Sequence, residues 1–133
     1  MGRLAALPLL IALASHAKGD AFALELVRID AEDRSQEPTH FSPTDRFKAL
    51  ITCPPAWRGV VGVVVYQAGK SYVPLPLQAL ESCGNRRTLP GAFRIDGSAS
   101  ARVCASFASN LAEWRVPVEA GGVCTELQPS PAD

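Results

Sequence analysis

Four widely spaced cysteines constrain the fold of this chain more than any other feature. They are Cys53, Cys83, Cys104 and Cys124, at successive separations of 30, 21 and 20 residues. The sequence holds no Cys-x-x-Cys pair, whereas zinc sites and thioredoxin-like redox centres are marked by closely spaced ligands or thiols. An even number of cysteines in an oxidising compartment indicates structural disulfides instead. We therefore expect two disulfides, no metal and no cofactor.

The N-terminus predicts that oxidising compartment. Arg3 is followed by an uncharged apolar run, Leu4–Ala14, and by the small residues Ser15 and Ala17. This is the layout of a secretory signal peptide, here residues 1–17. The run is shorter than the roughly 20 residues that span a bilayer, so no transmembrane span is expected. Cleavage after Ala17, or a few residues later, would give a secreted or periplasmic protein; an N-terminal core helix is the alternative.

Charge and composition exclude some classes of protein. Lysine and arginine together number 13, as do aspartate and glutamate, whereas nucleic-acid-binding domains usually carry a basic face. Hydrophobic residues make up 47% of the chain, which is ordinary for a globular protein. We expect one domain over residues 18–128 and, because the end is polar and contains proline, a disordered tail over residues 129–133.

Strand parity favours one of the three disulfide connectivities. In the stretch ARVCASFA, apolar residues that should face the core alternate with Cys104, which therefore faces away from it. In GVCTEL, Cys124 likewise lies on the face opposite the apolar residues. The two cysteines can thus meet across neighbouring antiparallel strands, which leaves Cys53 to pair with Cys83. The other two connectivities stay open at this point.

Short apolar segments separated by turn residues indicate β structure. Val60–Gln67 is almost entirely apolar and rich in β-branched residues, as in a strand buried on both faces. Ala68–Lys70 is a turn, and Ser71–Leu75 is the returning strand of a hairpin. Further strands are expected at Ala21–Ile29, Asp45–Cys53, Ala92–Asp96, Ala101–Ser109, Trp114–Val118 and Val123–Leu127. A short helix is the alternative for Ala21–Ile29. Leu77–Ser82 is read as a helical turn and Cys83–Pro90 as a loop.

These segments predict an all-β fold. The expected architecture is a small antiparallel β-sandwich of about seven short strands, Ig-like in general architecture and stapled by two disulfides. A partly open barrel is the alternative.

Three stretches resemble a known kind of domain. They are DRFKALITCPPAW, VVVYQAGKSYVPLP and LPGAFRIDG with the following ARVCASFA. They are similar to small extracytoplasmic β-sandwich domains of unknown function in bacterial envelope and signalling proteins. The resemblance covers roughly residues 45–108, and Asp45 follows Thr44 where the pattern has glycine. It implies a secreted bacterial β-sandwich and carries no catalytic residue over to this chain.

Few residues suggest catalysis. Nucleophilic hydrolysis needs a serine or cysteine activated by a base, usually histidine. After residue 17 the sequence offers only His40, in the polar stretch Asp30–Thr44, and no G-x-S-x-G motif. We therefore predict a non-enzymatic protein. The alternative is a small secreted hydrolase or thiol enzyme without a recognisable motif.

Two pairs of residues are candidates for binding a partner. Trp57 and Arg58 could hold a ligand by stacking and cation–π contact, although a tryptophan in a small domain more often caps the core. Arg86 and Arg87 lie in the expected loop CGNRRTLP. That loop has three interpretations: a solvated loop end, an anion- or partner-binding patch, or a disulfide-pinned protease-inhibitor loop.

These observations together predict a binding or interaction module. The expected partner is an envelope or extracellular protein or a cell-wall component, and no nucleic acid.

Overall fold

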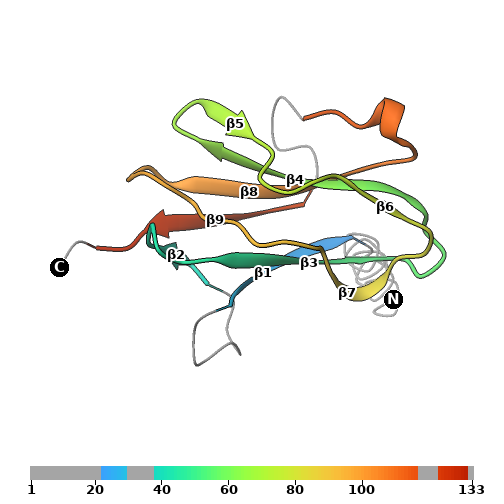
Figure 1. Ribbon diagram of the computed structural model, residues 1–133, viewed down its shortest axis with the longest axis horizontal. Helices are drawn as coiled ribbons and strands as arrows, with labels where there is room; N and C mark the ends of the chain where they lie inside the picture. The colour runs from blue at the N-terminus through green and yellow to red at the C-terminus, as the bar shows by residue number, and fades with distance from the viewer. Residues whose placement is uncertain (1–21, 30–37, 117–122, 132–133) are drawn as a thin grey trace, which may run out of the picture.

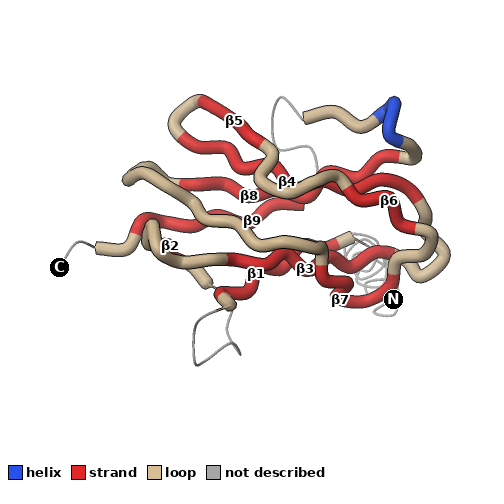
Figure 2. The backbone as a smooth tube through the Cα atoms, viewed as in Figure 1, coloured by secondary structure: helices blue, strands red, loops and turns tan. Residues whose placement is uncertain are grey.

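The structure, a computed structural model, describes residues 22–29, 38–116 and 123–131. Regular structure in these residues is almost entirely β-strand (Figure 2). The strands are β1 (Ala23–Arg28), β2 (His40–Phe41), β3 (Phe47–Cys53), β4 (Gly59–Gln67), β5 (Lys70–Tyr72), β6 (Gln78–Leu80), β7 (Gly84–Thr88), β8 (Ala101–Ala108) and β9 (Val123–Pro129). The only helical element described is a 3₁₀ turn, η1 (Leu111–Glu113). No described helix has the length and apolar character to cross a membrane.

The strands form two sheets that lie in two layers (Figure 1). One is three-stranded, in the order β1-β3-β7. The other is six-stranded, in the order β2-β9-β8-β4-β5, with β6 also paired to β4. Strand pairs are antiparallel, except that the two-residue β2 runs parallel to β9. The prediction of an all-β fold is therefore confirmed at the level of fold class.

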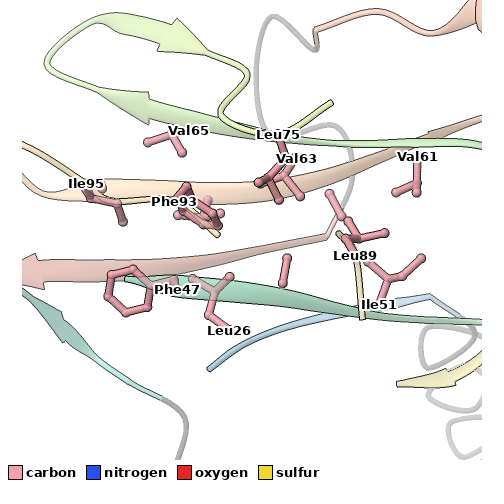
Figure 3. Packing of buried hydrophobic residues seen from close by; sticks show 14 of the residues in the cluster. Leu26, Phe47, Ile51, Val61, Val63, Val65, Leu75, Leu89, Phe93 and Ile95 are labelled. Carbon is pink, nitrogen blue, oxygen red and sulfur yellow. The ribbon is translucent and has the colours of Figure 1, made fainter. Parts of the chain in front are cut away.

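The hydrophobic core fills the space between the two sheets (Figure 3). Leu26, Phe47 and Ile51 reach it from the three-stranded sheet, and Val63 and Val65 from β4. All five are at most 1% exposed. Burying a side chain of this size contributes about 1.5–3 kcal/mol each, so this layer is the main source of the fold's stability.

Two predicted strands are confirmed with their burial patterns. In β3 every second residue is buried, beginning at Phe47, as the alternation in the sequence requires. In β4 the first seven residues are all buried, which confirms a strand covered on both faces. The hairpin to β5 is also confirmed, although its return strand is Lys70–Tyr72 and not Ser71–Leu75. Ala68 and Gly69 both have positive φ, the conformation of a two-residue turn that follows strand twist.

A second layer of side chains covers the outer face of β4. A Cβ atom at Gly62 would lie 2.5 Å from the Trp114 ring and also clash with Leu77, so both side chains pack directly on the strand backbone. The Trp114 Nε1 group donates a hydrogen bond to the Ser106 carbonyl of β8 at 2.9 Å. The segment after η1 is thereby fixed to the six-stranded sheet.

Two segments predicted as a helical turn and a loop are strands instead. Gln78–Leu80 pairs with β4 as β6, and Gly84–Thr88 pairs with β3 as β7. Four of the five β7 residues are exposed because β7 lies at an edge of its sheet. Polar residues are usual on an edge strand, so by composition such a strand looks like a loop.

Two other segments are not the strands that the pattern predicts. Ala92–Asp96 contributes one bridge, in which Phe93 exchanges backbone hydrogen bonds of 2.8 and 3.0 Å with Phe47. Phe93 and Ile95 are buried and the residues next to them are exposed. This alternation resembles a strand in the sequence, although the segment forms no continuous strand pairing. Of the predicted strand Trp114–Val118, residues 114–116 are irregular chain after η1, and the rest lies outside the described residues.

Both predicted disulfides are present, Cys53–Cys83 and Cys104–Cys124. Cys104 lies directly opposite Cys124 in the β8–β9 register, on the face away from the core, as parity required. All four cysteines are paired. Structural disulfides of this kind indicate an oxidising, extracytoplasmic environment.

The structure can be compared with the expected boundaries of the domain at its C-terminal end only. The expected signal peptide, residues 1–17, lies outside the described residues. At the other end β9 continues to Pro129, and the Ser130 amide donates to the Phe41 carbonyl at 2.8 Å. The start of the expected tail is thus paired to β2, and residues 132–133 are outside the described part.

Candidate binding cleft

An open cleft of about 640 Å³ lies at the end of the molecule where β8 leads into η1. It is lined by Phe22, Trp57, Ser106, Phe107, Ala108, Ser109, Glu113 and Val123. These residues come from the starts of β1 and β9, the β3–β4 connection, and β8 with its following turn. The volume lies within the range of about 300–1,000 Å³ that is usual for ligand pockets.

Three aromatic rings form one wall of the cleft. The ring centroids of Phe22 and Phe107 are 4.9 Å apart, those of Trp57 and Phe107 5.6 Å, and those of Phe22 and Trp57 5.8 Å. All three pairs are edge-to-face or near it, the arrangement that aromatic quadrupoles favour. The rings are partly buried and pack against the core, so the wall is supported from behind.

Local sequence explains why Trp57 reaches the cleft. Pro54 and Pro55 end β3, because proline cannot continue a strand ladder. The chain then turns, and the Trp57 amide donates to the Pro54 carbonyl at 2.9 Å. A Cβ atom at Gly59 would lie 2.7 Å from the Trp57 ring. The glycine therefore lets the indole lie against the start of β4.

The lining of the cleft also includes a carboxylate, that of Glu113. The Asn110 side chain caps η1 by accepting a hydrogen bond from the Glu113 amide at 3.0 Å. The Glu113 side chain is exposed, and within the described part of the chain it makes no hydrogen bond or ion pair. Among the described residues that line the cleft, it is also the only charged one. The cleft therefore has an aromatic wall and a carboxylate in its lining.

The two arginines predicted as contacts are engaged within the protein. Arg86 binds the Glu25 carboxylate through Nε at 2.9 Å and Nη2 at 3.0 Å. This hydrogen bonding, together with the charge of Glu25, raises the pKa of Arg86. The Arg87 guanidinium donates to the carbonyls of Ser82 and Cys83 at 2.9 and 2.8 Å. Arg86 therefore links β7 to β1 across β3, and Arg87 holds the chain segment that leads into β7.

Trp57 and Arg58, the other predicted pair, have different surroundings. Trp57 lines the cleft, whereas Arg58 is not among the lining residues. Arg58 forms an ion pair with Glu81 at 3.2 Å, in which the side chains are 74% and 90% exposed. A pair so exposed contributes little to stability. The four predicted contact residues therefore contribute one member, Trp57, to the cleft.

Sequence reasoning missed most of the cleft. Phe107 was expected to face the core, and it does so partly, but β8 ends there and leaves one side of the ring open. Phe22 and Glu113 carry no local signal, because their role depends on chain segments far away in sequence. A usable hint was Asn110, whose side chain is a strong helix cap three residues before Glu113.

The chain matches no protein-family model, no curated protein and no solved structure. Among the described residues, no three histidine, cysteine or acidic side chains are grouped so that they could hold a metal ion. The cleft is therefore interpreted from its own geometry.

Proposed function

We propose that this protein is a non-enzymatic binding module of the extracytoplasmic space, secreted or periplasmic, which contacts a partner through the cleft. The observation that carries the proposal is the aromatic wall of Phe22, Trp57 and Phe107 beside the Glu113 carboxylate, which has no partner among the described residues. Partly exposed aromatic side chains are typical anchors of protein interfaces. An envelope or extracellular protein is the partner that this surface suits best.

The strand order supports an Ig-like sandwich as the scaffold. If β1, β3 and β7 are taken as strands A, B and E, then β4, β8 and β9 correspond to C, F and G, and β5 to C′. Sandwiches of this kind present their connecting segments at the two ends of the sheets. Binding residues are often placed on such segments, because a rigid scaffold positions them. The cleft lies at one such end.

The alternatives receive less support. A thiol enzyme needs a thiolate, and all four cysteines are in disulfides. The candidate base His40 lies on β2, at the other end of the molecule from η1 (Figure 1). An inhibitor loop must present its arginine to a protease, whereas Arg86 and Arg87 are held by internal partners.

Blocking the cleft tests the proposal. Ser109 is exposed and lines the cleft, so Ser109→Trp should fill it without disturbing the core. Lys70→Trp, at the exposed first residue of β5, is the matched control, because the β4–β5 turn lies at the other end of the molecule from η1 (Figure 1). Each protein is immobilised and exposed to the secreted and envelope fraction of the native host, after thermal unfolding has shown that all three are folded.

We expect the wild type and Lys70→Trp to retain the same partner, and Ser109→Trp to lose it. Equal retention by Ser109→Trp, or no partner retained by any of the three, would count against a binding role for the cleft.

A further inference from the structure

We propose that the cleft recognises a cationic side chain, lysine or arginine, presented by a partner protein. The inference rests on the proposed binding role and adds the chemistry of the ligand. Its basis is that the three rings and Glu113 line one space.

The charge of the residues that line the cleft determines which sign of ligand charge is favoured. Glu113 is the only ionisable residue among the described residues that line the cleft, and none of them is lysine, arginine or histidine. An anionic ligand would find no counter-charge there and would be repelled by the carboxylate. A purely apolar ligand would remove water from an unpaired carboxylate, which costs free energy. A cation satisfies the carboxylate instead.

The aromatic wall suits the rest of such a side chain. Lysine and arginine carry apolar stems that pack along hydrophobic surface while the charged end meets a polar partner. Aromatic faces also attract cations electrostatically, tryptophan most strongly. Trp57 and Phe107, with centroids 5.6 Å apart, can cover the stem while Glu113 meets the charge.

The backbone position of Glu113 is fixed before any ligand binds. Asn110 caps η1 through the Glu113 amide, and Trp114 is held by its hydrogen bond to the Ser106 carbonyl. Arg115, two residues after Glu113, is engaged elsewhere, since its Nη1 donates to the carbonyls of Ala112 and Trp114 at 2.6 and 2.9 Å. The backbone that carries the carboxylate is therefore already in place, and only the Glu113 side chain has to be ordered on binding.

Three capped tripeptides test the sign and the site. The probes are acetyl-Gly-Lys-Gly-amide, its neutral norleucine analogue and its acidic glutamate analogue. Binding to the protein is followed by backbone amide NMR shifts at fixed salt. Glu113→Gln is the test variant, and Glu126→Gln is the control, because Glu126 is exposed on β9 and paired with Arg102.

We expect the lysine probe to shift amides around Trp57, Phe107 and Glu113. The norleucine probe should bind about tenfold more weakly, and the glutamate probe should not bind. Glu113→Gln should remove the preference for lysine over norleucine, while Glu126→Gln should keep it.

Three outcomes would overturn the inference: equal binding of lysine and norleucine, preference for glutamate, or no binding of any probe in the cleft. The blocking experiment then decides whether the proposed binding role stands without the preference for a cation. If Ser109→Trp alone loses the native partner, the binding role of the cleft stands and only the inference about its ligand falls. If Ser109→Trp retains the partner as well as the wild type does, both proposals fall.

Discussion

At the scale of single residues, two glycines of β4 set the positions of both tryptophans. Gly59 leaves room for the Trp57 ring in the cleft wall, and Gly62 leaves room for Trp114 on the outer face of the sheet. A side chain at either position would need the space that an indole now occupies. Glycine is usually unfavourable inside a strand, so these two positions are explained by close packing.

Gly62→Ala should lower the free energy of unfolding by about 2–3 kcal/mol, because overpacking forces Trp114 and Leu77 to move. Gly69→Ala is the control: no atom lies within 4 Å of its Cβ position, and only its positive φ is strained. That strain costs about 1 kcal/mol. Urea unfolding of both variants measures the difference, and an equal loss in the two would show that the close packing at Gly62 is not decisive.

Single residues were predictable where alternation decides their environment. Phe47 and Cys104 face as their strand parity requires. Arg86 was not predictable, because its partner Glu25 is 61 residues away in sequence and meets it only through the β1-β3-β7 order. Two adjacent arginines look the same in the sequence whether their side chains are free to bind a ligand or are already bound to other parts of the protein.

At the scale of elements, edge strands are the part that the sequence conceals. The central strands β4 and β8 carry long apolar runs, since they are paired on both sides and covered on both faces. The edge strand β7 is polar and has Arg86 with a positive φ, so it resembles a turn. The segment around Phe93 shows the converse: buried alternate residues without strand pairing.

The β4–β5 hairpin offers an element-scale prediction. Ala68 has a φ of 53° in a two-residue turn completed by Gly69. Alanine tolerates this region poorly, whereas asparagine followed by glycine favours it. Ala68→Asn should therefore stabilise the protein by about 0.5–1 kcal/mol.

Thermal and urea unfolding of Ala68→Asn provide the measurement. The control is Ala92→Asn, at an exposed residue whose φ is not positive, which should change stability very little. If both substitutions have the same effect, the strain assigned to the turn is absent.

At the scale of the whole molecule, each disulfide links two neighbouring strands within one of the two sheets. Cys53–Cys83 closes a loop of 30 residues and attaches the start of β7 to the end of β3. Cys104–Cys124 closes a loop of 20 residues and links β8 to β9. In a domain of this size such links form a large part of a total stability of roughly 5–15 kcal/mol.

Removing either disulfide, as Cys53→Ala with Cys83→Ala or Cys104→Ala with Cys124→Ala, should lower the free energy of unfolding by about 3–4 kcal/mol. The unreduced wild type should show no reactive thiol after denaturation. A reactive thiol in the unreduced protein, or a pair of substitutions without effect, would contradict the assigned connectivity.

The central claim is that this protein meets its partner at the cleft. A photo-cross-linking residue, p-benzoylphenylalanine, placed singly at Ser109, Arg87 or Lys70 tests it most directly, since the three exposed positions sample the cleft, β7 and the far turn. Irradiation in the native host's secreted and envelope fraction should give a defined adduct from Ser109 alone. An adduct from Arg87 or Lys70 with none from Ser109 would contradict the account.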